Sequence, residues 1–214
     1  EIADLAYKDG IDIAVEFNGF MHGGRVGILA HRPAPIQINY LAYPGTMGSG
    51  SYDYIIGDHT IIPEHQSANY SEKIIYLPNC YMPQDNNRQI SNKPISRAEC
   101  GLPVTGFVFC CFNNSFKISP NEFNIWMRLL KSVEGSVIWL LKTNNWAEEN
   151  LRNEAKKRGI KPNRLVFADR LPLNEHLRRI KNADLFLDTF NFNAHTTASD
   201  ALWAGLPVVT KIGK

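Results

Sequence analysis

The second half of the chain alternates short apolar runs with longer stretches of helical periodicity. Runs typical of buried strands occupy residues 107–112, 137–141, 165–167, 185–187 and 208–210. The stretches between them predict helices at residues 120–133, 146–158 and 174–182, and another that begins near residue 196. Strands that alternate with helices imply a parallel sheet with right-handed crossovers. The pattern therefore predicts an α/β unit.

The first half shows the same alternation with shorter elements. Helical segments are expected at residues 1–9 and 26–31, and strands at residues 11–17, 36–41, 54–56 and 73–77, the first of them buried. Residues 83–103 are polar and punctuated by prolines, as in a linker. We therefore expect the C-terminal part of one Rossmann-like domain at residues 1–82, the linker at 83–103, and the N-terminal part of a second at 104–214. Both domains are expected to be truncated, because the chain begins within a helical pattern and stops just after a strand.

The loop that follows the predicted strand at residues 185–187 has chemistry that suits an anion. It ends in His195, Thr196 and Thr197, which open the next helix, with one of the threonines expected as its N-cap and Asp200 in its first turn. Amide groups at a helix start, beside hydroxyls and an imidazole, can bind phosphate. This loop lies at the carboxyl end of its strand, where open parallel sheets bind ligands. The alternative is that these residues only cap the helix.

Three further residues are expected at the same edge of the sheet. Lys117 follows the first strand of the second unit and could pair with a phosphate, although a loop lysine is often only solvated. His176 and Arg179 are three residues apart and share a helix face. His176 could stack on a base, or it could be a surface histidine.

Several motifs are absent, and their absence narrows the chemistry. The chain contains no G-x-G-x-x-G and no G-x-x-x-x-G-K-[ST], which disfavours a dinucleotide dehydrogenase and a P-loop enzyme. It also contains no D-x-D, so no acidic pair is placed to hold a metal on a diphosphate. A site without metal has to neutralise a diphosphate with lysine, arginine and helix N-termini. The residues described above supply that set.

Composition adds few constraints. With 44% hydrophobic and 21% charged residues the chain can build a sizeable core, and a net charge of +2 gives no general argument for nucleic acid or membrane binding. The four cysteines show no C-x-x-C spacing, so we expect reduced thiols in the cytoplasm and neither zinc nor disulfides. No apolar run approaches the length of a membrane span.

Five segments together resemble the catalytic region of O-GlcNAc transferases. They are residues 29–37 (LAHRPAPIQ), 43–48 (YPGTMG), 53–56 (DYII), 70–73 (YSEK) and 194–205 (AHTTASDALWAG). This family of glycosyltransferases has the GT-B fold, in which two Rossmann-like domains face a cleft, and usually carries tetratricopeptide repeats upstream. The resemblance covers nearly the whole chain, and the compact linker is more similar to bacterial members than to the animal enzyme.

The resemblance implies transfer of N-acetylglucosamine from UDP-GlcNAc to protein Ser or Thr hydroxyls, without a cofactor or metal. It assigns Lys117 to the diphosphate and the leaving group. It assigns the remaining donor-binding roles as follows: His195, Thr196 and Thr197 to the phosphates, Asp200 to the ribose, His176 to the uracil, Arg179 to a neighbouring basic position, Asn114 to the donor site, and Leu41 and Ala42 to the sugar. The implied partners are the UDP-sugar donor, a protein acceptor and the upstream repeats, with neither nucleic acid nor membrane.

The chain departs from the animal family pattern at four positions. Leu173 and His22 replace lysines, Phe116 replaces a tyrosine, and Ala42 replaces a glycine. The active-site histidine of the family lies before Glu1, so this chain by itself is not expected to be an active enzyme. Two alternatives stay open: a GDP-fucose-dependent protein O-fucosyltransferase, whose plant members share the His-Thr-Thr helix start, and a non-catalytic binding module.

Overall fold

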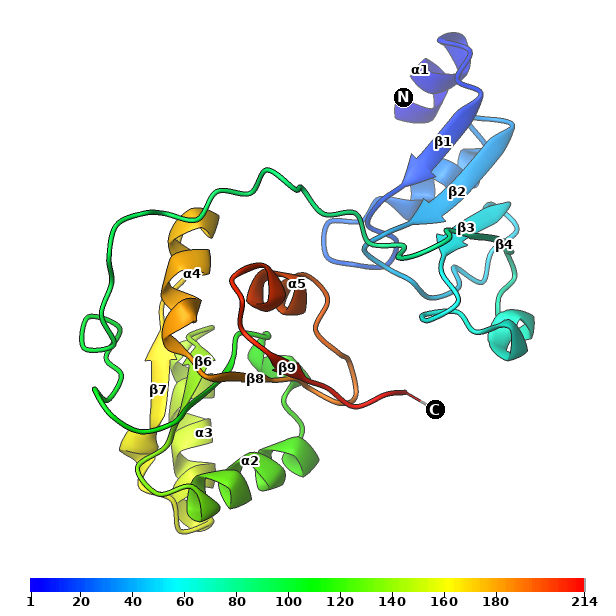
Figure 1. The fold of residues 1–214 in the computed structure, drawn as a ribbon. Coiled ribbons are helices and arrows are strands. Elements are labelled where there is room, and N and C mark those ends of the chain that lie inside the picture. Colours follow the sequence, from blue (N-terminus) through cyan, green and yellow to red (C-terminus); the bar gives the residue numbers. More distant parts are fainter. Residues whose placement is uncertain (214) are drawn as a thin grey trace. The chain divides into compact units, whose positions relative to one another are not determined.

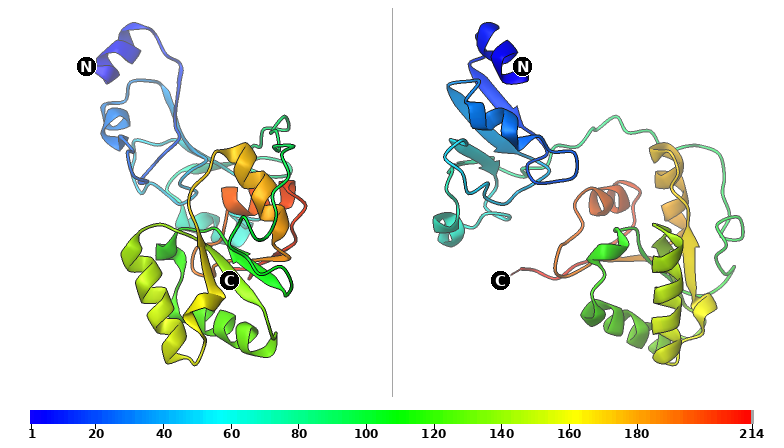
Figure 2. Two further views of the ribbon diagram at one scale, coloured as in Figure 1. Left: turned by 90° about the vertical axis from the view of Figure 1, so that its left-hand side faces the viewer. Right: turned by 180° about the vertical axis from the view of Figure 1, so that it is seen from behind.

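The computed structural model describes residues 1–213, and the chain forms two compact units. The first unit is Glu1–Gln84, and the second begins at Asp85 and continues to the end of the chain (Figures 1 and 2). None of the helices in the described residues is both long and apolar enough to span a membrane.

The first unit is built on a parallel sheet of four strands in the order β1-β2-β3-β4 (Figure 1). Its elements are α1 (Ile2–Lys8), β1 (Ile13–Glu16), the 3-10 helix η1 (Val26–His31), β2 (Ile36–Tyr40), β3 (Tyr54–Gly57), the 3-10 helix η2 (Glu64–Asn69) and β4 (Lys73–Tyr76). These positions confirm the predicted alternation. Arg32 ends η1 in a left-handed backbone conformation, with φ of 49°.

The prediction that the first strand is buried was wrong. Ile13 and Val15 of β1 are 52% and 39% exposed. Among the described strands β1 pairs only with β2, at the edge of the sheet, so its side chains have a neighbouring strand on one side only. An apolar run therefore identified the strand but not its exposure.

The second unit is a five-stranded parallel sheet in the order β7-β6-β5-β8-β9. Its elements are β5 (Val108–Cys111), η3 (Ser115–Lys117), α2 (Pro120–Ser132), β6 (Val137–Leu141), α3 (Asn145–Lys157), η4 (Pro162–Arg164), β7 (Leu165–Ala168), α4 (Leu173–Arg179), η5 (Ile180–Asn182), β8 (Leu185–Leu187), α5 (Thr196–Trp203) and β9 (Val208–Val209). In chain order this is the 3-2-1-4-5 arrangement of a Rossmann-like sheet. The direction of the crossovers reverses between β5 and β8, which makes that junction the switch point.

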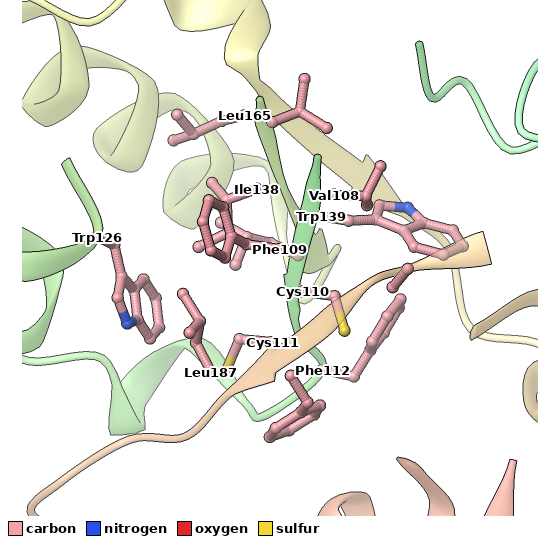
Figure 3. Close-up of a cluster of buried hydrophobic side chains, with 14 of the residues drawn as sticks. Val108, Phe109, Cys110, Cys111, Phe112, Trp126, Ile138, Trp139, Leu165 and Leu187 are labelled. Atoms are coloured by element: carbon pink, nitrogen blue, oxygen red, sulfur yellow. The ribbon is translucent and has the colours of Figure 1, made fainter. Parts of the chain in front are cut away.

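Both faces of the sheet are buried at its central strand, β5. Figure 3 shows Phe109 and Cys111 of β5 on the side of Trp126, which belongs to α2, while Val108 and Cys110 point to the opposite side. All four β5 residues are at most 5% exposed. A strand covered on both faces needs a continuous apolar sequence, which is what residues 107–112 provide.

Part of the segment expected as a linker packs against the second unit. Arg97 Nη2 donates to both carboxylate oxygens of Asp184, at 3.0 and 2.8 Å, and Asp184 Oδ2 also accepts from the backbone N–H of Val108 at 2.8 Å. Leu102 joins the hydrophobic core. The polar segment at residues 83–103 therefore connects the two units and also supplies side chains that pair with charged groups of the second unit.

We predict that Asn144→Ala lowers the stability of the second unit. The Asn144 side chain caps α3 by accepting from the N–H of Ala147 at 2.8 Å. Loss of an N-cap costs about 1 kcal/mol, so the midpoint of a thermal melt should fall. Asn144→Asp keeps the acceptor and should melt close to the wild type; equal melting of the alanine variant and the wild type would contradict the assignment.

Candidate functional site

The carboxyl ends of β5 and β8 bring together polar residues at the switch point. The two strands pair in parallel, with Cys110 opposite Phe186. Asn113 follows β5 and Asp188 follows β8, and both are almost fully buried, at 2% and 3% exposure. Because the crossovers diverge here, the loops leave room for a ligand beside these residues.

Asp188 is the acceptor that orders the loop between β8 and α5. Its Oδ1 accepts from the N–H groups of Thr189 and Ala194, both at 2.7 Å. Its Oδ2 accepts from Asn193 Nδ2 at 3.1 Å and from Thr210 Oγ1 at 2.6 Å. One buried carboxylate thus fixes both ends of the loop and the residue after β9.

Asn113 connects this loop to the start of α5. Its Nδ2 donates to Asp188 Oδ1 at 3.1 Å and to Thr189 Oγ1 at 2.8 Å. Its Oδ1 accepts from the hydroxyl of Thr197. The amide therefore joins β5, β8 and α5 in one hydrogen-bond network.

The predicted threonine cap of α5 was wrong. His195 occupies the N-cap position without a capping side-chain hydrogen bond, and Thr196 and Thr197 are the first two helical residues. The Thr197 hydroxyl instead donates to Asn113 Oδ1, a partner 84 positions earlier in the chain, which local sequence preference does not reveal. The first turn nevertheless presents its N–H groups at the switch point, as an anion site requires.

Lys117 and His195 meet through an aromatic side chain. The Lys117 Nζ lies 4.2 Å from the centroid of the Phe192 ring and 3.4 Å from the carbonyl oxygen of Asn193. The His195 ring stacks on Phe192 with centroids 5.3 Å apart. Lys117 and His195 thus lie at one edge of the sheet, as predicted.

Burial lowers the pKa values of Lys117 and His195 and so favours their neutral forms. It lowers the pKa of the half-buried Lys117 ammonium, against the opposing attraction of Asp188. It also lowers the pKa of His195, and the positive charge of Lys117 adds to that shift. A cation that is poorly compensated by its surroundings is available to pair with an incoming anion.

His176 and Arg179 contact each other, as their spacing predicts. Arg179 Nε donates to His176 Nδ1 at 3.2 Å, which places the histidine proton on Nε2, and Arg179 Nη1 donates to the carbonyl oxygen of Asp169 at 2.6 Å. Burial, reinforced by Arg179, lowers the pKa of His176 to about 4. The neutral His176 ring contacts the Phe112 ring edge to face, with ring centroids 4.9 Å apart, and could stack on a base.

Asn114 and Arg179 have protein partners. Asn114 Oδ1 accepts from Arg170 Nη2 at 3.1 Å, at the surface of the unit. Arg179 is 5% exposed and lies over the rings of Phe112 and Trp139. Arg179 therefore acts here as a support for His176.

Asp200 lies deeper in α5 than predicted. It is the fifth residue of the helix, not part of the first turn. Its Oδ1 accepts from Arg88 Nη1 at 2.7 Å, in an ion pair whose two side chains are each 8% exposed. Burial raises the pKa of Asp200, and Arg88 opposes that shift.

Leu41 and Ala42 lie in the first unit, directly after β2. Leu41 has a φ of 84°, a region that L-residues rarely occupy. Ala42 donates its N–H to the carbonyl oxygen of Phe17 at 3.2 Å. Strained backbone at the carboxyl end of a strand marks a candidate functional position.

A comparison with protein-family models decides the family. The model described as "Glycosyl transferase family 41" matches residues 1–93 and 86–214. The chain belongs to this family.

Individual relatives of this family 41 chain agree with that assignment. It is 39% identical over 215 residues to the probable UDP-N-acetylglucosamine--peptide N-acetylglucosaminyltransferase SEC of Arabidopsis thaliana, which aligns with 98% of this chain and 22% of that protein. It is 31% identical to the similarly described SPINDLY protein of Solanum lycopersicum, covering 100% of this chain and 23% of that one. The chain thus spans less than a quarter of the length of these two relatives.

A solved structure supports the fold. An O-GlcNAc transferase mutant of Thermobaculum terrenum matches with a TM-score of 0.85 and 28% identity, over 99% of this chain and 40% of that one. The parallel sheets and this match establish the α/β, GT-B type of architecture for the family 41 chain.

Sequence reasoning missed three residues of this site. Asn113, Asp188 and Arg88 carry its buried hydrogen bonds and ion pair. The signal for the first two was available, since each is a polar residue at the end of a strand beside the switch point. Arg88 gave no signal, because it lies in a segment whose composition reads as a linker.

We predict that Asp188→Ala destabilises the second unit by roughly 3 kcal/mol or more. Several buried donors would lose their acceptor, and each unsatisfied donor costs about 1–3 kcal/mol. The measurement is the thermal midpoint of the full-length protein. Asp188→Asn retains one carbonyl oxygen and should lose less; an alanine variant that melts with the wild type would show that the network contributes little.

Proposed function

We propose that the full-length protein transfers N-acetylglucosamine from UDP-GlcNAc to Ser or Thr hydroxyls of proteins in the cytoplasm. The observation that carries this proposal is the cluster at the switch point, where Lys117, His195 and the first turn of α5 lie together, while the neighbouring helix α4 carries His176, whose pKa is lowered to about 4. Such a set fits a nucleoside diphosphate: cationic and N–H donors for the phosphates, and an aromatic ring for the base. Family membership and the names of the relatives support the same donor and acceptor.

Each residue has a proposed role. Lys117 pairs with the diphosphate and stabilises it as it leaves, because the negative charge on the leaving group grows in the transition state. The start of α5, with His195, Thr196 and Thr197, binds the phosphates. Asp200 accepts from the ribose, and the Nε2–H of His176 faces the base. Asn114 and Arg179 support this site, and Leu41 and Ala42 contribute contacts to the sugar.

The donor site is proposed to need no metal ion. A divalent cation on a diphosphate is usually held by carboxylates. The carboxylate nearest the anion site, Asp188, already accepts four hydrogen bonds from the loop and from Thr210 as well as one from Asn113. The charge of the diphosphate is then balanced by Lys117 and the helix start.

Calorimetric titration of the full-length protein with UDP and with GDP tests the donor class. We expect UDP to bind more tightly than GDP, and EDTA to leave the UDP affinity unchanged. Tighter binding of GDP would favour the protein O-fucosyltransferase alternative. Loss of UDP affinity in EDTA would contradict the metal-free site, and UDP binding without turnover on acceptor proteins would favour a non-catalytic module.

We predict that Lys117→Ala lowers the turnover number by roughly 10²-fold or more, an estimate for the loss of one group that stabilises transition-state charge. The affinity for the donor should fall less, since other contacts hold the ground state. Steady-state kinetics and a binding titration on the full-length protein measure both quantities. Lys161→Ala, which removes an exposed lysine after α3, is the matched control; equal turnover in both variants would reject the role of Lys117.

A further inference from the structure

Arg88 is held against α5 by three contacts. Its Nη1 donates to Asp200 Oδ1 at 2.7 Å. Its guanidinium lies over the Trp203 ring, 4.8 Å from the centroid, and Trp203 Nε1 donates to the carbonyl oxygen of Arg88 at 3.2 Å. Asp200 and Trp203 are three residues apart on α5, so both contact Arg88 from the same face of the helix.

The ion pair with Arg88 acts against the effect of burial on the charge of Asp200. Burial of a carboxylate favours its neutral, protonated form, and Arg88 is the cation that opposes this effect on the pKa of Asp200. A protonated carboxyl group is a weaker acceptor than a carboxylate. Because Arg88 uses Oδ1, we assign Oδ2 to the ligand.

We propose that Arg88 is a positioning residue for nucleotide binding: it keeps Asp200 oriented and ionised, so that the carboxylate accepts from a ribose hydroxyl. The inference rests on the proposed function, in which Asp200 contacts the ribose. Arg88 itself is not proposed to touch the nucleotide.

The test compares two ligands on the full-length protein: UDP and 2′,3′-dideoxy-UDP, which lacks the ribose hydroxyls. The wild type should bind UDP on the order of tenfold more tightly or better, the effect of a charge-assisted hydrogen bond. Arg88→Met should lose most of this preference, because UDP binds more weakly while dideoxy-UDP binds as before. Arg88→Lys keeps the positive charge and should recover part of the preference.

Arg97→Met is the matched control. Like Arg88, Arg97 belongs to the segment before β5 and pairs with an aspartate, Asp184. Asp184 directly precedes β8, so this pair lies at the amino ends of the strands, opposite to the candidate site. Removal of Arg97 loosens the same segment without changing Asp200. The Arg97 variant should therefore keep the full preference for UDP over dideoxy-UDP.

The pH profile of UDP affinity supplies a second readout. Without Arg88 the pKa of Asp200 rises, so the affinity should fall away at a higher pH in Arg88→Met than in the wild type. On α4, which packs against α5, Glu175 pairs with Arg178 and His176 with Arg179, and β9 carries no titratable side chain. These groups, His195 at the helix start and the phosphates of UDP are common to both proteins, so the difference between the profiles belongs to Asp200.

Three results would overturn the inference. The first is an Arg88→Met variant with the full ribose preference, and the second is one that binds UDP more tightly than the wild type, as expected if Arg88 competes with the nucleotide. The third is a pH profile that does not move. If Arg88→Met does not fold, Arg88→Lys decides by the same ligand pair. If the wild type prefers GDP, the proposed donor is wrong, and GDP with its dideoxy analogue tests Arg88 independently.

Discussion

The second unit depends on a buried carboxylate at the point where its chain crossovers diverge. A parallel sheet leaves unpaired polar backbone at the carboxyl ends of its strands, and the divergence of the crossovers prevents the neighbouring loops from covering each other. Asp188 satisfies this requirement by accepting two backbone N–H groups of its own loop, and Asn113 links it to β5. A network of this kind is stable only when every member has a partner, which makes the loop before α5 rigid before any ligand arrives.

That rigidity has a consequence for anion binding. The negative charge of Asp188 attracts the Lys117 ammonium and opposes the effect of burial on the pKa of that lysine. The oxygens of Asp188 accept hydrogen bonds from the loop, from Asn113 and from Thr210, while the partly desolvated Lys117 contacts the Phe192 ring and the carbonyl oxygen of Asn193. In the proposed reaction, a partly desolvated cation and a helix start at the same end of the sheet would give preorganised stabilisation of the charge on the leaving group.

The sequence predicted the elements well because burial imposes periodicity. β5 and α2 are covered by the same core, and their apolar patterns, continuous in one and helical in the other, followed directly from that. The pattern failed at β1, where an apolar strand is exposed. It also failed at Thr197, which was expected to cap the helix and instead donates to a side chain in the loop after β5, Asn113. Local propensity carries no information on partners that are distant in the chain, and Arg88, 112 positions before Asp200, is the extreme case.

α5 unites these contacts. Thr197 hydrogen-bonds to Asn113 in the loop after β5. Asp200 and Trp203 contact Arg88, which belongs to the segment before β5. Three residues of α5, spaced three apart, therefore bind two distant parts of the chain. The same helix offers its N-terminus to an anion, and its carboxylate lies about one turn further along. A helix fixed at both points cannot tilt to meet phosphate and ribose separately. If the start of α5 binds phosphate and Asp200 binds the ribose, as proposed, the helix itself sets the spacing of the two sites, and a nucleoside diphosphate carries both groups at one fixed spacing.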